Sequence, residues 1–255
     1  MREIDFDKPS QDDLVISWGK TIDKYGKEEQ QEPLFKYVNE SLFEKPVYKV
    51  LIEIYNNSVF KTPVCTKDVA IEGKKKELID NFINVYTGMP VFKLGYNFLV
   101  ENNLIKDDYN AFIDELYHFW FGMYSRCHRT HTQGSSGWEH VFSGEWKEDI
   151  IDGHHNWIRY YLLQKEGRIK YHGHTKVKGN VTGDIQYTWD GYLKEVGGFF
   201  MNTSPIFDFT VFTICSLPQY GNSDCNIKVD GYDIKIVSFH QKCDDGICLS
   251  TCYPS

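Results

Sequence analysis

The spacing of hydrophobic residues changes near the middle of this 255-residue chain, and that change constrains the fold more than any other feature. In the first half, apolar side chains recur every three or four residues, as they do on one face of a helix. After Gly134 glycine becomes frequent, and apolar residues alternate with polar ones as in half-buried strands. The pattern predicts an α+β fold, with a helical N-terminal lobe at residues 1–125 and a β-rich lobe at residues 126–255 that together form one domain.

Four apolar stripes predict the helices of the first lobe. Ser10 is placed to cap the first of these helices at its N-terminus. The stripes consist of Leu14, Val15, Trp18 and Ile22; Val47, Leu51, Ile52 and Tyr55; Leu78, Ile79, Phe82, Ile83 and Tyr86; and Phe112, Ile113, Leu116, Phe119, Trp120 and Met123.

The second lobe is expected to contain antiparallel sheets and one main helix. Alternating residues 185–189 lead into an Asp-Gly pair at 190–191, and a second pair at 230–231 separates two further alternating runs. Asp-Gly pairs between alternating runs are typical of tight β-hairpins. Residues 157–162 instead share a helical face, and Gly167 follows where a helix C-cap is expected.

Charge and hydropathy limit the classes of partner. The net charge of −8 argues against a protein that holds polyanions by bulk electrostatics. The most basic stretch of the second lobe is residues 165–178, which are most simply explained as a solvated hairpin. No apolar run reaches the roughly 18–20 residues of a membrane span. No signal peptide is visible at the start of the sequence, and we expect a monomer.

Seven cysteines leave at least one thiol unpaired in a monomer. The spacing of Cys243 and Cys248 around an Asp-Asp-Gly turn suits a disulfide across a hairpin. No CxxC pair exists, which argues against a zinc ribbon. Together with four N-x-S/T sequons, the cysteines favour an extracellular location slightly over a cytoplasmic one.

Histidines cluster between His128 and His155, where five of the nine in the chain occur. Glu139, His140 and Glu145 could ligate a cation, but the HExxH pattern of a zinc protease is absent. Two imidazoles could instead exchange protons with a substrate, since one can act as base and the other as acid. The alternative is that the His154–His155 pair only begins a helix and solvates its end.

Four sequence blocks in this order, GWEHVFSGE, GHHNW, WDGYLKEVGGFFMNTSP and STCYP, resemble the signatures of the EndoU (XendoU-like) family. These are uridylate-specific endoribonucleases, distantly related to the coronavirus uridylate-specific endoribonuclease. Segments of the first half, such as LFKYVNESLF and WFGMYSR, resemble the N-terminal lobe of the family. The resemblance therefore covers nearly the whole chain.

The resemblance implies a role for each matching residue. His140 and His155 match the two catalytic histidines of the family, and Lys194 matches the catalytic lysine. Supporting acids that the family needs are matched by Glu139 and Glu145. The substrate-binding threonine and tyrosine that close the site correspond to Thr251 and Tyr253, whereas His154 replaces an apolar residue and is expected to be structural.

One departure from the family pattern concerns base recognition. In the viral relatives a serine four residues past the lysine helps to read the uracil, and that position is Gly198 here. Glycine offers a backbone N–H but no hydroxyl. The resemblance therefore implies RNA cleavage more strongly than it implies a strict preference for uridine.

The implied reaction is cleavage of single-stranded RNA by attack of the ribose 2′-OH on the adjacent phosphorus, which leaves a 2′,3′-cyclic phosphate. His155 is assigned as the base and His140 as the acid, while Lys194 stabilises the phosphorane. This chemistry requires no metal, although family members are often activated by Mn²⁺ or Ca²⁺, for which Glu139 and Glu145 are possible ligands. Two rival interpretations are an RNA-binding protein that does not cleave and a metal-dependent phosphodiesterase.

Overall fold

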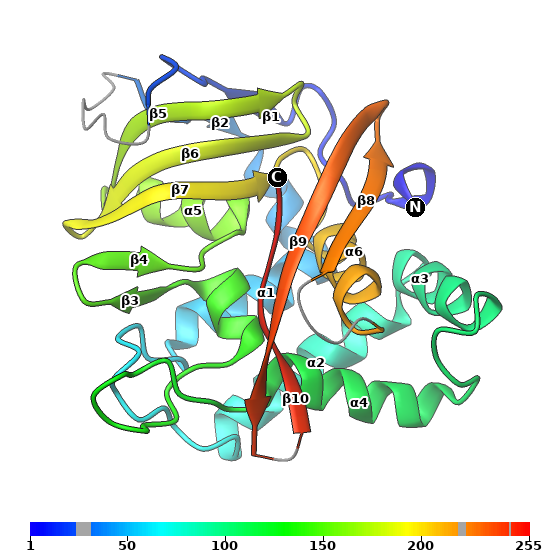
Figure 1. Ribbon diagram of the computed structural model, residues 1–255. Helices are drawn as coiled ribbons and strands as arrows, with labels where there is room; N and C mark the ends of the chain where they lie inside the picture. Colours follow the sequence, from blue (N-terminus) through cyan, green and yellow to red (C-terminus); the bar gives the residue numbers. More distant parts are fainter. Residues whose placement is uncertain (24–31, 219–222, 245) are drawn as a thin grey trace.

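Helices and sheets pack together around one continuous apolar core (Figure 1). The computed structural model describes residues 1–23, 32–218, 223–244 and 246–255. The predicted α+β class is confirmed, since helices and three sheets are both present. The division into lobes at residues 125 and 126 stays a prediction.

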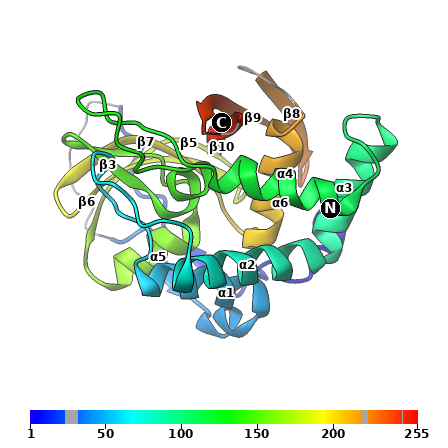
Figure 2. The same cartoon turned by 90° about the horizontal axis from the view of Figure 1, so that it is seen from below.

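Three of the four apolar stripes form the predicted helices. They are α1 (Pro46–Asn57), α2 (Gly73–Gly88) and α4 (Tyr109–Phe121). Each buries its stripe in the core, and α1 and α2 lie side by side (Figure 2). A further helix, α3 (Pro90–Glu101), was not predicted.

The first stripe is not a helix, so that prediction is wrong. Leu14–Ile16 form the short strand β1, which pairs antiparallel with β2 (Phe35–Val38). The β-branched pair Val15–Ile16 favours a strand, and Gly19 adopts a φ of 62° that would end a helix. The remaining short helices of this half are the 3₁₀ segments η1 (Arg2–Ile4) and η2 (Glu40–Glu44).

A five-stranded sheet and a three-stranded sheet make up the β-rich part. The larger has the order β3-β4-β7-β6-β5, and the smaller β10-β9-β8. Only antiparallel pairing was expected, yet β4 and β7 run parallel. The strands are β3 (Glu145–Lys147), β4 (Ile150–Asp152), β5 (Ile169–Lys178), β6 (Thr182–Trp189), β7 (Tyr192–Phe200), β8 (Ser223–Val229), β9 (Tyr232–Cys243) and β10 (Gly246–Pro254).

Both predicted hairpins are confirmed, between β6 and β7 and between β8 and β9. At each turn both residues of the Asp-Gly pair have positive φ, with 51° and 90° at the first turn and 49° and 88° at the second. This is the type I′ geometry, whose twist matches that of the flanking strands.

The β-rich part contains two helices rather than one. The predicted helix is α5 (Trp157–Lys165), and Gly167 follows it at a φ of 72°. The second, α6 (Pro205–Ser216), is buried along almost all its residues. It was missed because a helix that is apolar all round shows no periodic stripe.

Three disulfides link the described chain: Cys65–Cys127, Cys215–Cys225 and the predicted Cys243–Cys248. The remaining thiol, Cys252, is buried. Among the described residues no helix combines the length and the apolar character that a membrane crossing requires.

The two sheets meet where β10 ends beside β7 (Figure 1). At Gly198 of β7 an added Cβ would lie only 2.3 Å from the backbone oxygen of Pro254. Glycine therefore permits the close approach of two strands that belong to different sheets. The candidate site lies at this junction.

Candidate active site

A pocket of about 390 Å³ lies between the ends of β7 and β10 and the segment before α5. It brings together residues that are far apart in the sequence. Its lining consists of His140, Asp152, Gly153, His155, Asp184, Lys194, Val196, Gly198, Phe239, Thr251, Tyr253 and Ser255. Six of the residues predicted for the site are therefore in contact with one cavity, whereas Glu139 and Glu145 are not.

His140 projects from η3 (Glu139–Ser143), a single π-helical turn. The turn closes with a hydrogen bond of 2.8 Å from the N–H of Gly144 to the carbonyl of Glu139. Isolated π turns are frequent at functional sites because they displace a side chain from the regular helical position. Here the ring of His140 lines the pocket while its Nδ1 lies 3.0 Å from Oε2 of Glu145.

The segment that carries the second histidine is held against this turn by its backbone. The N–H groups of His154 and His155 each donate a 2.7 Å hydrogen bond, to the carbonyls of His140 and Val141. Gly153 precedes them at a φ of 68°, and a Cβ there would lie 1.9 Å from the carbonyl oxygen of His140. Only glycine fits this approach.

The ring of His155 is fixed on two sides. Its Nδ1 lies 2.9 Å from the carbonyl of Gly198, to which it donates, so that Nε2 carries the free lone pair. The ring of Tyr253 stacks on it with centroids 4.9 Å apart. The rings of His140 and His155 are 6.2 Å apart. Burial lowers the pKa of both histidines well below the usual value, which favours neutral imidazoles in the free protein.

Lys194 is buried at the wall of the pocket, with 8% of its surface exposed. Burial lowers the pKa of its ammonium to about 8, although Asp152 opposes the change. Its side chain forms no hydrogen bond or ion pair with any other residue in the described ranges. A cation without an internal partner is available to an anion that enters the pocket.

The two predicted acids lie behind the pocket. Glu145 is fully buried and its Oε2 is 3.4 Å from Nε of Arg126 as well as close to His140. Burial raises the pKa of Glu145 to about 8, and Arg126 opposes the rise. Glu139 has no exposed surface and no hydrogen-bond partner for either carboxylate oxygen among the described residues, and burial together with the neighbouring Glu145 raises its pKa well above the usual value.

The acids do not present a cation site at the pocket. Neither buried carboxylate of Glu139 or Glu145 lines it, and its own acids are Asp152 and Asp184. In the described part of the chain, the one group of three potential ligands close enough to share an ion is His118 with Cys243 and Cys248, whose two sulfurs form a disulfide. The residues at the pocket therefore do not fit a resident metal, and the activating cation stays a prediction.

Sequence patterns did not reveal several residues that complete the site. Arg126 approaches both Glu145 and Asp152 and donates to the carbonyl of Ser250 on β10. No motif marks an arginine just after a helix, so only the three-dimensional contacts identify it. His154, as expected, is buried away from the pocket, with its Nδ1 2.6 Å from the hydroxyl of Tyr187.

The comparisons with known proteins agree on one family. The family model described as endoribonuclease XendoU matches residues 1–254. Uridylate-specific endoribonucleases of Mus musculus and Homo sapiens are each 35% identical over 92% of this chain. The poly(U)-specific endoribonuclease-B of Xenopus laevis is 30% identical over 90% of this chain and 79% of its own length. The chain spans 58% of the length of the mouse and human relatives.

The fold is similar to a solved structure as well. XendoU, described as a splicing-independent snoRNA-processing endoribonuclease, superposes with a TM-score of 0.80 at 28% identity. The match covers 99% of this chain and 93% of that one.

The close contact between β7 and β10 can be tested by measuring the free energy of unfolding of a Gly198 variant. Gly198→Ala should lower the free energy of unfolding by about 1–3 kcal/mol, because the new Cβ overlaps the backbone of Pro254. Gly88→Ala is the matched control, since Gly88 ends α2 with open space around it and should be neutral or stabilising by up to about 1 kcal/mol. Urea denaturation measures both variants. Equal stability of Gly198→Ala and wild type would show that the strands are not in this contact.

Proposed function

The chain belongs to the XendoU family of endoribonucleases, and on that premise we propose that it cleaves single-stranded RNA at uridylates, leaving 2′,3′-cyclic phosphate ends. The observation that carries the proposal is the group formed by His140, His155 and Lys194. Both rings bind a protein acceptor through Nδ1 and line the pocket, and the lysine beside them has no internal partner among the described residues. These are the groups that an in-line transesterification needs.

His155 is the base in this proposal. Its Nδ1–H is bonded to a neutral carbonyl, and burial favours the uncharged ring, so Nε2 is available to take the proton of the ribose 2′-OH. The 2′-oxygen then forms a bond to the adjacent phosphorus, and the bond from phosphorus to the 5′-oxygen breaks.

His140 is the acid, because its partner is a carboxyl group rather than a carbonyl. Glu145 lies 3.0 Å from Nδ1, and an ionised Glu145 stabilises the imidazolium while Nε2–H protonates the leaving 5′-oxygen. Arg126 beside Glu145 favours the ionised carboxylate and offsets part of the burial that raises the pKa of Glu145 to about 8. Entry of a phosphate also favours the protonated ring, since it adds negative charge to the pocket.

Lys194 supplies fixed positive charge to the non-bridging oxygens of the phosphorane. Its burial strengthens this interaction relative to water. Thr251 and Tyr253 are proposed to contact the base. The hydroxyl of Thr251 has no hydrogen-bond partner among the described residues, and Tyr253 extends an aromatic face beside His155. Gly198 contributes its carbonyl to His155 and offers the base no hydroxyl, so discrimination of uridine from cytidine is expected to be modest.

A divalent cation is proposed only as an activator of RNA binding or site order, and no step of the reaction depends on it. An extracellular location is proposed because three disulfides are typical of proteins from oxidising compartments. A monomer is proposed because one chain supplies every group that the mechanism uses.

The catalytic assignment is tested by His140→Ala, His155→Ala and Lys194→Ala. Each should lower kcat by about 10²–10⁴-fold on a deoxyoligonucleotide that contains one ribouridine, because each removes a proton transfer or the phosphorane charge. Lys93→Ala, an exposed position on α3, is the control. Circular dichroism melting confirms that the variants are folded. A variant that is folded and keeps more than about a tenth of the wild-type kcat has no such role.

The pH dependence tests Lys194 separately. The ammonium must be charged, and burial lowers its pKa to about 8, so kcat/KM of the wild type should fall as pH rises through about 8. In Lys194→Arg the guanidinium stays charged to above about pH 12. The variant should therefore have a lower kcat/KM than wild type, but that value should no longer fall near pH 8.

The control for this profile is Lys93→Arg, which should leave the fall near pH 8 in place. An unchanged alkaline fall in Lys194→Arg would assign it to another group.

A further inference from the structure

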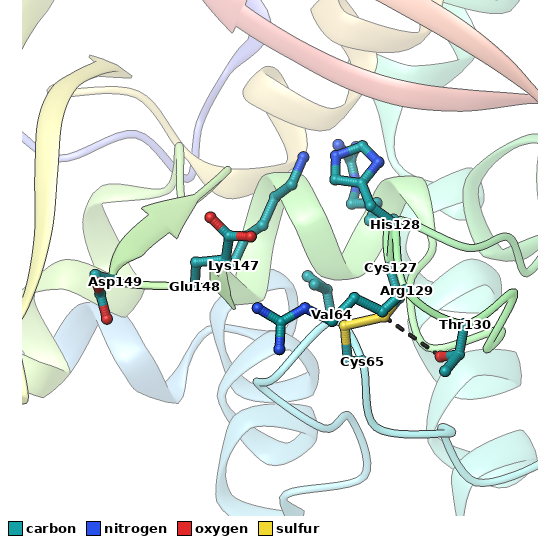
Figure 3. A pocket seen from close by; sticks show the side chains of 10 residues that line it. Val64, Cys65, Cys127, His128, Arg129, Thr130, Lys147, Glu148 and Asp149 are labelled. Carbon is teal, nitrogen blue, oxygen red and sulfur yellow. Dashed lines mark hydrogen bonds between the residues drawn. A yellow bond between two sulfur atoms is a disulfide. The ribbon is translucent and has the colours of Figure 1, made fainter.

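Figure 3 shows a second pocket, of about 570 Å³. It adjoins the catalytic pocket, because Arg126 of its lining forms an ion pair with Asp152 of the catalytic lining. Its walls come from the β3–β4 turn and from the segment after α4. The lining residues are Val64, Cys65, Arg126, Cys127, His128, Arg129, Thr130, Lys147, Glu148 and Asp149. Arg126 belongs to both regions, because it lines this pocket and contacts Glu145 and Asp152 of the catalytic site.

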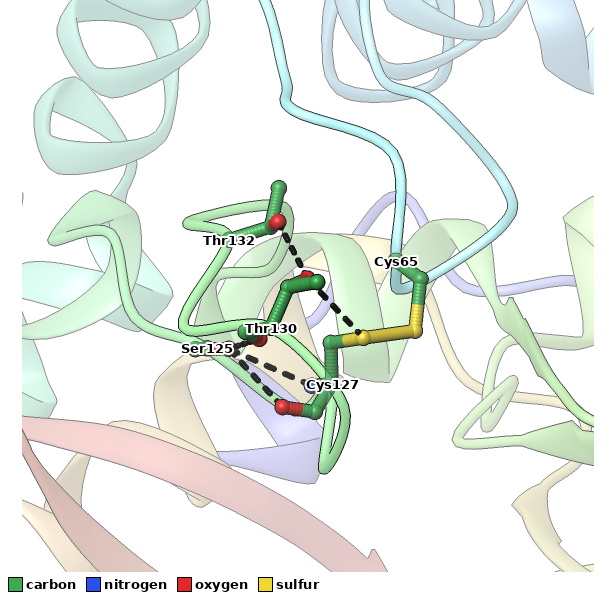
Figure 4. Close-up of a disulfide and its surroundings, with 5 residues drawn as sticks. All are labelled: Cys65, Ser125, Cys127, Thr130 and Thr132. Carbon is green, nitrogen blue, oxygen red and sulfur yellow. Dashed lines mark hydrogen bonds between the residues drawn. A yellow bond between two sulfur atoms is a disulfide. The ribbon is translucent and has the colours of Figure 1, made fainter.

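The walls of this second pocket are fixed by covalent and backbone bonds. The disulfide Cys65–Cys127 joins the loop after α1 to the segment after α4, and the hydroxyl of Thr130 lies 3.4 Å from Sγ of Cys127 (Figure 4). The same loop is bonded to β3, since the N–H of Val64 donates to Trp146 at 3.1 Å and the N–H of Trp146 donates to Thr62 at 2.7 Å. A pocket held in this way is formed before any ligand arrives.

Two cations of this pocket, Lys147 and Arg129, have no internal partners within the described part of the chain. The side chains of Lys147 and Arg129 form no hydrogen bond or ion pair with another residue of those ranges, although Glu148 and Asp149 also line the pocket. By contrast, two cations of residues 165–178, the most basic stretch of the β-rich part, already form ion pairs. Lys165 pairs with Glu40 at 2.6 Å and Arg168 with Asp190 at 2.5 Å.

Lys147 connects this pocket electrostatically with the catalytic one. It lies two residues after Glu145 on β3, and its charge is the smallest contribution to the lowered pKa of His140, after burial, Arg126, His155 and Lys194. The positive charge of Lys147 therefore acts at His140, the proposed acid. It can also attract the RNA strand that would be cleaved there.

We propose that this pocket is a phosphate subsite, in which Lys147 and Arg129 bind the backbone of the RNA strand beyond the scissile phosphodiester. The inference rests on the proposed function, since it names how that site holds a strand longer than two nucleotides. Contacts of this kind recognise phosphate rather than sequence, so they favour length without changing the base preference.

The experiment compares a uridine-containing dinucleotide, which has a single phosphate, with a 12-nucleotide strand that contains one ribouridine. In the double variant Lys147→Gln/Arg129→Gln, the ratio of kcat/KM for the 12-mer to kcat/KM for the dinucleotide should fall about tenfold. The log–log slope of binding against salt should become shallower by about 0.7 for each phosphate that the variant no longer neutralises.

The matched control is the double variant Lys93→Gln/Lys106→Gln, which also removes two positive charges. These exposed lysines lie on α3 and in the loop after it, and α3 is at the opposite end of the molecule from β3 (Figures 1 and 2). The control should leave the ratio at the wild-type value. A ratio that is unchanged in Lys147→Gln/Arg129→Gln, or lowered equally in the control, overturns the subsite.

Methylphosphonates placed at one position at a time locate the phosphate involved. Wild type should lose affinity at one or two positions outside the scissile bond, and Lys147→Gln/Arg129→Gln should no longer show that decrease. Binding is measured by fluorescence anisotropy of a 2′-deoxy 12-mer, which needs no cleavage. If wild type binds this strand through Lys147 and Arg129 but cleaves no RNA, the proposed function fails and the subsite remains. If wild type cleaves RNA but loses the same affinity at every methylphosphonate position, the subsite is ruled out and the proposed function stands.

Discussion

Two backbone hydrogen bonds, from the N–H groups of His154 and His155 to the carbonyls of His140 and Val141, hold the site together. They fix the segment before α5 against a π turn, so the two catalytic candidates are placed by main chain rather than by flexible side chains. The contact requires Gly153, whose missing Cβ leaves room for the carbonyl of His140. Rings positioned in this way need little reorganisation when a phosphate enters, which is the condition for effective proton transfer.

Burial determines the charges of the site. It favours neutral imidazoles in the free protein, lowers the pKa of Lys194 and raises that of the acids behind the pocket. Arg126 offsets part of this cost, because its guanidinium lies between Glu145 and Asp152. In a chain of net charge −8, local groups of this kind, rather than the protein as a whole, would have to attract the proposed RNA substrate.

Periodicity and motifs predicted a large part of this architecture. Four helices, both Asp-Gly hairpins and one disulfide follow from local patterns, and the signature blocks named the histidines, the lysine and the residues of β10 that share the pocket. Local patterns failed where tertiary contacts decide. Residues 14–22 have helical spacing, but Leu14–Ile16 pair as a strand with β2. Helix α6 is too apolar on every face to show a stripe. Arg126 and Lys147 belong to no sequence motif. Their proposed roles depend on the packing of β3 beside the segment after α4, which a local pattern cannot show.

The most direct test of the account concerns the nucleophile. The protein is incubated with two deoxyoligonucleotides, one with a single ribouridine and one with a 2′-O-methyluridine in its place, and the products are identified by mass spectrometry. The account predicts cleavage only after the ribouridine, a 2′,3′-cyclic phosphate on the upstream fragment, and persistence of the reaction in EDTA when the strand is present at a saturating concentration. Cleavage of the 2′-O-methyl strand, or a first product without the cyclic phosphate, would contradict it, because either result requires a nucleophile other than the neighbouring 2′-hydroxyl.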